Sequence, residues 1–243
     1  MSERKRTTPL TPVAITTEEC TLDMKRRIIV GLPFLHDVSG RELREVEPIF
    51  RELGFAAGQQ IDTGAGRGLF VVGAGLVKLV RSDYEGRDVV LDILVTGEFF
   101  GRMVGFSEVD VAVAHTAACV FHAGDQQLKR LFQRHPEIAV RLLEMTSARI
   151  GRLHERLHLL SGASARDRVV TTLQRLAEKV GVRSAKGILL QVPLSREDLA
   201  ALSGTSTETA SRIISALQRE GLLAAGRRWI TLRERFLESS GLV

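Results

Sequence analysis

The sequence is poor in the residues that mark several common protein classes. Its 243 residues include two cysteines, Cys20 and Cys119, too few for the disulfide framework of a small secreted protein or for a four-cysteine metal site. Six prolines and no Pro-rich tract leave little room for a long linker. No apolar run approaches the roughly 20 residues that cross a bilayer, and residues 1–20 do not resemble a secretory signal. We therefore expect a cytoplasmic protein without a membrane segment.

The charge is distributed unevenly along the chain. The composition is 44% hydrophobic and 26% charged, as expected of a globular protein. Residues 1–162 hold 21 Lys+Arg and 21 Asp+Glu, whereas residues 163–243 hold 13 and 8, so the whole net charge of +5 lies in the last third. A basic terminal domain beside a neutral larger one indicates a module that binds a polyanion.

The first two thirds predict an arm, a β-rich domain and a long helix. Residues 1–30 are expected to form an N-terminal arm with a short helix near Leu22–Val30. Within residues 31–136, a helix over Gly40–Leu53 precedes short β-type runs, and 11 of the 22 glycines lie between Gly54 and Gly105, where they suit tight turns. This pattern favours a β-roll or small barrel.

Residues 137–162 are predicted to form a dimerisation helix. Leu143, Ile150 and Leu157 are seven residues apart, and Leu153 and Leu160 belong to a companion row. A single apolar seam among charged positions is typical of a parallel coiled coil and indicates a homodimer, although the same stripe could dock on the β-roll. Residues 161–164 are expected to be the hinge to the last domain, residues 163–243.

The last domain contains a predicted helix-turn-helix. Ser195 with Asp198 forms a variant of the capping box at the start of one helix, Gly204 marks the turn, and Ser206 caps a second helix that Gly221 ends. The second helix has an apolar face and a separate polar stripe, formed by Glu208, Ser211, Arg212 and Ser215. Such a stripe fits the DNA major groove, where arginine bonds guanine and glutamate accepts from a cytosine amino group.

Two further groups of residues are candidates for contact with DNA phosphates. The first is the turn Thr205, Ser206 and Thr207, which offers hydroxyls and helix-terminal amides. The second is the basic tip, Arg227 and Arg228, of a predicted hairpin between residues 222 and 232. This hairpin would be the wing of a winged helix-turn-helix, and double-stranded DNA is the expected partner.

These features together resemble the CRP/FNR family of bacterial transcription regulators. The resemblance rests on Val95–Gly101, on His135-Pro136-Glu137 before the long helix, and on Leu194–Ala200 leading to Thr207–Arg212. It implies an α+β fold: a cyclic-nucleotide-binding-like β-roll, a dimerisation helix and a C-terminal winged helix-turn-helix domain. It also implies a homodimer on a palindromic promoter element, RNA polymerase as a partner, and, from Glu208, Ser211 and Arg212, half-sites of the TTGAT type.

The signal stays open at the level of sequence. Cyclic AMP is not expected, because Arg102 stands where nucleotide-binding relatives carry glutamate and no arginine or lysine follows before Lys129. Arg102 is a candidate for binding another anion, or for a salt bridge to Glu108 or Asp110. The resemblance places Cys119 at the β-roll cysteine of iron–sulfur relatives, but two cysteines cannot hold their four-cysteine cluster. Cys20 and Cys119 could instead form a reversible disulfide, or Cys119 could simply be a buried apolar residue. Haem is retained as an alternative, with His115 as a candidate ligand.

The sequence argues against two other classes of function. An enzyme would need a metal cluster or an activated nucleophile, and the sequence shows no metal-ligand constellation and no catalytic residues in the β-roll region. A β-roll that serves as a ligand-binding interaction module without binding DNA is the alternative, against which the basic helix-turn-helix counts.

Overall fold

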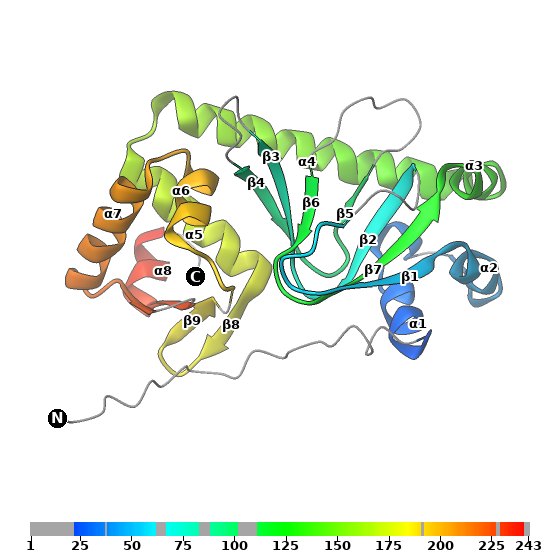
Figure 1. Ribbon diagram of the computed structural model, residues 1–243, viewed down its shortest axis with the longest axis horizontal. Helices are drawn as coiled ribbons and strands as arrows, with labels where there is room; N and C mark the ends of the chain where they lie inside the picture. Colours follow the sequence, from blue (N-terminus) through cyan, green and yellow to red (C-terminus); the bar gives the residue numbers. More distant parts are fainter. Residues whose placement is uncertain are drawn as a thin grey trace. The chain divides into compact units, whose positions relative to one another are not determined.

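The computed structural model describes residues 22–36, 38–61, 67–82, 88–101, 111–190, 192–226 and 229–240. Two compact units are present, one spanning Ile15–Ser161 and the other containing Gly162–Val243. Figure 1 shows the elements of each.

The first unit is built on a β-roll of two antiparallel sheets. One sheet has the order β1-β7-β2-β5 and the other the order β4-β3-β6. Side chains from both sheets meet in an apolar interior that includes Phe70, Val72 and Val120 from one sheet and Val77 and Leu79 from the other. The strands are β1 (Arg51–Phe55), β2 (Gly68–Ala74), β3 (Val77–Ser82), β4 (Asp88–Leu94), β5 (Phe99–Phe100), β6 (Val111–Ala114) and β7 (Ala118–Gly124).

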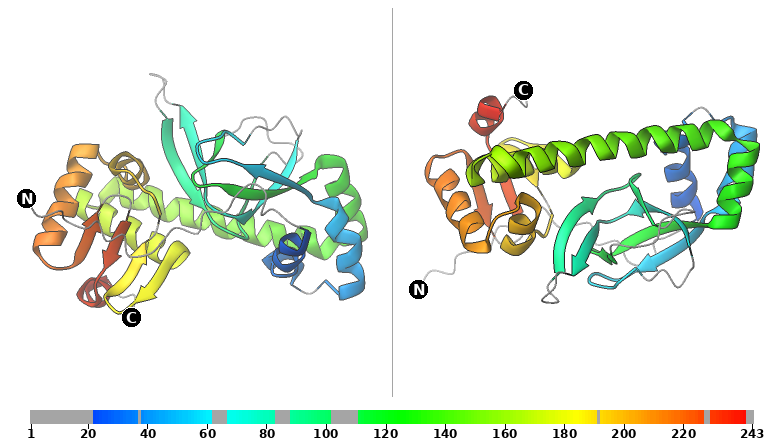
Figure 2. Two further views of the ribbon diagram at one scale, coloured as in Figure 1. Left: turned by 60° about the horizontal axis from the view of Figure 1, so that its bottom comes forward. Right: turned by 90° about the horizontal axis from the view of Figure 1, so that it is seen from above.

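Helices cover the other face of the β1-β7-β2 sheet, and α4 runs beside the roll (Figure 2). Their core contacts come from Ile29, Leu128 and Ile138 against Cys119 and Phe121. The elements are α1 (Leu22–Val30), η2 (Pro33–Leu35), α2 (Gly40–Val46), η3 (Glu47–Ile49), α3 (Asp125–Arg134) and α4 (Pro136–Gly162). The short helix near residue 22 and the long helix over 137–162 are thus confirmed.

The predicted helix over Gly40–Leu53 is wrong in its second half. The α-helix ends at Val46, and the chain passes through η3 into β1, where Leu53 pairs with Val120 of β7. Pro48 lies in the second position of η3 and has no N–H to continue an α-helix. The amphipathic pattern therefore belonged to two elements rather than one.

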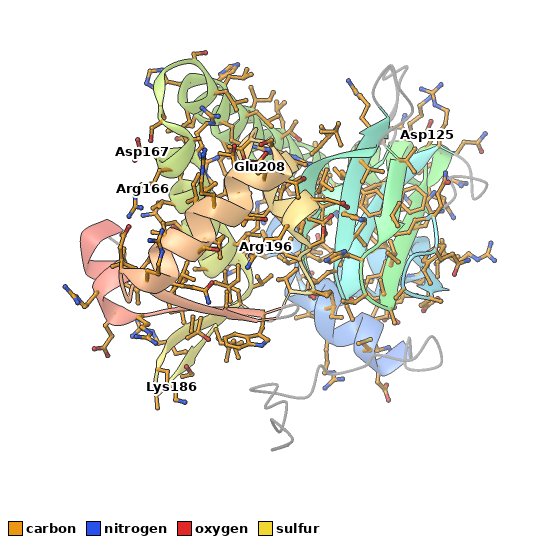
Figure 3. All side chains as sticks on the ribbon, turned by 60° about the vertical axis from the view of Figure 1, so that its left-hand side comes forward. Asp125, Arg166, Asp167, Lys186, Arg196 and Glu208 are labelled. Atoms are coloured by element: carbon orange, nitrogen blue, oxygen red, sulfur yellow. The ribbon has the colours of Figure 1, made fainter. Side chains whose placement is uncertain are left out.

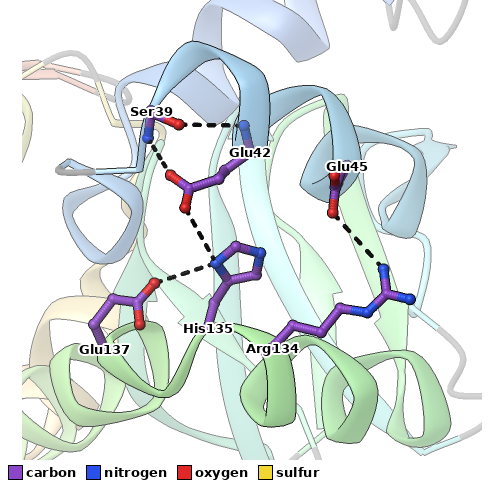
Figure 4. Close-up of polar contacts among 6 residues, drawn as sticks. All are labelled: Ser39, Glu42, Glu45, Arg134, His135 and Glu137. Carbon is purple, nitrogen blue, oxygen red and sulfur yellow. Dashed lines mark hydrogen bonds and ion pairs between the residues drawn. The ribbon is translucent and has the colours of Figure 1, made fainter.

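A polar joint connects α2 to the start of α4 (Figure 4). Ser39 caps α2, and its N–H donates to the Glu42 carboxylate at 2.8 Å. His135 is buried; its Nδ1 lies 3.2 Å from Glu137 Oε1 and 3.9 Å from Glu42 Oε1. The bonds from Ser39 hold the pKa of Glu42 below its ordinary value. The His-Pro-Glu segment thus serves as a structural joint.

Among its described residues, the second unit combines a four-stranded sheet, in the order β10-β11-β9-β8, with four helices. Its core includes Val169 and Leu173 of α5, Leu199 of α6, Ile214 of α7 and Phe236 of α8. The elements are α5 (Ala165–Val180), β8 (Gly181–Ser184), β9 (Gly187–Leu190), α6 (Arg196–Ser203), α7 (Thr207–Arg219), β10 (Leu223–Gly226), β11 (Trp229–Leu232) and α8 (Glu234–Ser240).

The predicted hinge at residues 161–164 is shorter than expected. Ser161 and Gly162 belong to the last turn of α4, and Ser164 is already the N-cap of α5, accepting a bond from the Asp167 N–H. Only Ala163 and Ser164 lie between the two helices. The predicted hairpin is present, with Gly226 opposite Trp229 in the β10–β11 register.

Candidate functional site

The helix-turn-helix is fixed by local caps at both of its helices. Ser195 Oγ accepts from the Asp198 N–H at 2.9 Å, and Asp198 Oδ2 accepts from the Ser195 N–H at 2.9 Å. Gly204 ends α6 at φ +61°, a left-handed conformation that favours glycine. Ser206 Oγ then accepts from the Thr209 N–H at 3.1 Å and starts α7. The predicted caps and turn are confirmed.

The two faces of α7 divide as the sequence indicates. Ala210, Ile213, Ile214 and Leu217 are buried, and the last three belong to the core of the unit. Glu208, Arg212 and Ser215 are exposed, and Ser211 is half-buried. Glu208 lies in the first turn of α7 (Figure 3). The helix therefore presents a polar surface that its own unit does not cover.

The remaining candidates for phosphate contact are placed differently from one another. Thr205 is half-buried, and its hydroxyl lies 3.1 Å from Ser203 Oγ, within the turn. Ser206 and Thr207 are exposed, but Ser206 Oγ also donates to Thr209 Oγ1 at 2.9 Å. The backbone amides at the start of α7 are therefore better candidates for binding an anion than the hydroxyls of Thr205 and Ser206, which already have partners within the protein. Arg227 and Arg228 lie outside the described residues.

The sequence reasoning missed three arginines of this unit. Arg196 begins α6 and lines a cavity of about 320 Å³ together with Trp229 and Leu194. Burial lowers its pKa. A cation in the first turn opposes the helix dipole, so the position of Arg196 directly after the Ser195 cap was a signal readable in the sequence. In α5, Arg168 bonds to the turn between α6 and α7, and Arg166 bonds to Glu220 at the end of α7.

The apolar seam of α4 is exposed. The exposed fractions are 66% for Leu143, 48% for Ile150, 46% for Leu153, 59% for Leu157 and 48% for Leu160. A different face of the helix meets the β-roll, where Arg149 donates to the Phe99 carbonyl at 3.1 Å and Arg156 to the Leu91 carbonyl at 2.6 Å. The alternative that the seam itself docks on the roll is therefore wrong.

Two of the candidate signal residues, Cys119 and His115, lie in or beside the β-roll. Cys119 is 1% exposed on β7 and is disulfide-bonded. His115 is half-buried after β6, and its N–H donates to the Leu76 carbonyl at 2.8 Å. Cys20 and Arg102 lie outside the described residues. Within the described part of the chain, no group of three or more His, Cys, Asp or Glu residues could hold a metal ion. No described helix is long and apolar enough to cross a membrane.

His122 is a buried titratable group to which the sequence analysis assigned no role. It is 6% exposed, its ring lies 4.4 Å from that of Phe70, and its Nε2 has no hydrogen-bond partner among the described residues. Burial, helped by the charge of Arg51, lowers its pKa from 6.5. The neutral imidazole is therefore the form that the fold accommodates.

Replacing His122 with phenylalanine should flatten the acid dependence of stability. Because the folded-state pKa is lowered, the unfolded chain takes up the proton first, and the free energy of unfolding falls as the pH drops below about 6.5. Phenylalanine keeps the ring but cannot be protonated. Denaturation at about pH 7.5 and about pH 5.5 measures the effect, with the exposed His158→Gln as control; an equal acid loss in His122→Phe and parent would contradict it.

Comparison with known proteins gives matches for both units. Residues 60–135 match the cyclic nucleotide-binding domain, and residues 167–237 match the Crp-like helix-turn-helix domain. The chain is 31% identical over 211 residues to the cyclic AMP receptor protein of Thermus thermophilus, covering 84% of this chain and 94% of that protein. It is 30% identical over 212 residues to the transcriptional activator protein FnrL of Cereibacter sphaeroides, covering 82% and 84%.

A solved structure supports the same relationship. FixK2 from Bradyrhizobium japonicum superposes with a TM-score of 0.68 at 26% identity, covering 76% of this chain and 93% of that one.

Proposed function

The chain belongs to the CRP/FNR family of transcription regulators, and we propose that it acts as a homodimer on a palindromic DNA element with half-sites of the TTGAT type. The observation that carries the proposal is the capped helix-turn-helix, whose α7 leaves Glu208, Arg212 and Ser215 exposed. The exposed seam of α4 supports the proposed dimer, since its apolar side chains offer an interface for a second copy and two copies are needed to read two half-sites. Such a dimer would act in the cytoplasm, with RNA polymerase as its partner at the promoter.

Binding of purified protein to a labelled palindrome with TTGAT half-sites tests this proposal. We expect specific binding that weakens steeply with salt, since phosphate contacts release counterions. The control is a duplex of the same composition with scrambled half-sites. Equal affinity for the two duplexes would refute sequence-specific recognition.

We further propose that the signal is the redox state of Cys119, with Cys20, the one other cysteine in the sequence, as the candidate partner. Two observations support this. Cys119 is disulfide-bonded, and its side chain belongs to the core cluster that also contains Ile138 and Leu142 of α4. Reduction, which takes two electrons and two protons from a thiol reductant, would change a residue packed beside the dimer helix. Cyclic AMP is not proposed, given the arginine at position 102.

Oxidised and reduced protein should therefore bind the palindrome with affinities that differ by about tenfold, the usual scale of coupling between two sites. Cys20→Ser and Cys119→Ser should each abolish the difference, because either variant prevents the disulfide. Alkylation followed by mass measurement reports the thiol state, and an absorption spectrum tests for haem. The redox proposal would be refuted if the oxidised and reduced parent bound DNA with identical affinity. It would also be refuted if the spectrum showed bound haem and the state of the haem determined the DNA affinity.

A further inference from the structure

Arg168 forms an unusual set of contacts at the start of α5. Its guanidinium donates to three backbone carbonyls: Nε to Ser203 O at 3.0 Å, Nη2 to Gly204 O at 3.0 Å and Nη1 to Ala163 O at 2.9 Å. Arginine carries five donors in a rigid planar fork, which lysine cannot reproduce. One half-buried side chain therefore connects two segments that lie about 40 residues apart in sequence.

The three carbonyls have different places in the unit. Ser203 is the last residue of α6 and Gly204 its left-handed C-cap, so the Arg168 cation meets carbonyls at the negative end of a helix dipole. The turn itself is stiffened by Ser203 Oγ, which donates to Leu199 O at 2.7 Å and lies 3.1 Å from Thr205 Oγ1. Ala163 directly follows α4 in the chain.

A second arginine of α5 binds the C-terminal end of α7. Arg166 Nη1 donates to Glu220 Oε1 at 2.9 Å, and its Nη2 bonds the second carboxylate oxygen. Glu220 is the C-cap of α7, and the bonds from Arg166 lower its pKa. Arg166 lies in the first turn of α5 (Figure 3). The Arg166 and Glu220 side chains are 43% and 44% exposed, and an ion pair in contact with solvent contributes little to stability.

We propose that Arg168 is a positioning residue that fixes α7 relative to the chain segment leaving α4, and thereby sets the half-site spacing that the dimer accepts. The inference rests on the proposed function. Only Ala163 and Ser164 separate α4 from α5. The bond from Arg168 to Ala163 O therefore ties α5 to the first residue of this connection. The bonds to Ser203 and Gly204 transmit that position to the start of α7.

The geometry of DNA makes spacing the sensitive quantity. Adding one base pair between the half-sites increases their separation by about 3.4 Å and rotates one half-site relative to the other by about 35°. With a rigid connection the two α7 helices cannot adjust to such a change, whereas a flexible connection lets them reach half-sites at the new spacing. Loss of the Arg168 bonds should therefore broaden the range of spacings that bind.

The test uses the full chain and a series of TTGAT palindromes whose central spacing varies by one and two base pairs. The variants are Arg168→Ala, Arg168→Lys and the matched Arg166→Ala, each measured where circular dichroism shows it folded. Arg168→Ala, which removes all three bonds, should bind the preferred spacing about tenfold more weakly, a change of about 1.4 kcal/mol in binding free energy. It should also lose most of the discrimination between spacings, while its affinity for scrambled DNA is unchanged.

The controls separate positioning from stability. Arg166→Ala should keep the parent's spacing profile, and Arg168→Lys, which retains the charge without the fork, should be intermediate. If Arg168→Ala does not fold, Arg168→Lys takes its place and must still broaden the profile. A profile of parental shape in the Arg168 variants, lowered equally at every spacing, would overturn the inference. Failure of the parent to prefer any palindrome would instead overturn the proposed function.

Discussion

Replacing Ile150 and Leu157 together with glutamate should convert the dimer to monomers and abolish binding to the palindrome. Both side chains lie in the exposed seam of α4, with exposed fractions of 48% and 59%. In a dimer each would be buried, a gain of about 1.5–3 kcal/mol per side chain. Glutamates at these positions would face like charges across a dry interface, which costs more than the lost burial.

The loss of DNA binding follows from the loss of the dimer. A dimer that engages one half-site holds its second α7 near the other, and such linkage raises affinity by about 10²–10⁴. A monomer retains the same helix-turn-helix without this gain. Sedimentation velocity gives the oligomeric state, and fluorescence anisotropy gives the affinity for the palindrome.

Gly151→Glu is the matched control for the seam variants. It adds a carboxylate one residue from Ile150, on a different side of α4, where a Cβ would meet nothing within 4 Å. This variant should remain dimeric and bind DNA as the parent does. A dimer that survives both seam substitutions would place the interface elsewhere.

The sequence predicted the features that depend on local spacing. Caps at Ser195 and Ser206, the turn at Gly204 and the two faces of α7 each follow from side-chain chemistry within a few residues. The heptad of α4 was readable for the same reason, since its positions repeat within one helix. These features were sufficient to identify the candidate DNA interface.

Other features depend on contacts that are distant in sequence. Strand β1 is held by pairing with β7, about 70 residues later, whereas the local pattern of its residues predicts the end of a helix. Arg168 has no local partner beyond Ala163, and its bonds to Ser203 and Gly204 exist only once α5 packs on α6. Periodicity and capping rules contain no information on such pairs. The contacts of Arg168 could therefore be found only in the folded unit.

The strongest single test of the DNA interface is Arg212→Ala. Arg212 is exposed on the same face of α7 as Glu208, which lies one helical turn earlier, and it is not among the buried residues of this helix. A bidentate bond from arginine to guanine contributes about 1–3 kcal/mol of discrimination, so specific affinity should fall by about 5- to 150-fold. Folding should be unaffected.

The pattern of the loss identifies the contact. The parent should discriminate strongly against exchange of the G·C pair of TTGAT for A·T, whereas Arg212→Ala should bind both sequences alike, because the side chain that distinguishes them is gone. Arg219→Ala, an exposed arginine in the last turn of α7, serves as control and should keep the discrimination while weakening binding slightly through lost phosphate attraction. Unchanged discrimination in Arg212→Ala would show that α7 does not read this base pair through Arg212, and the groove assignment of the helix would then be wrong.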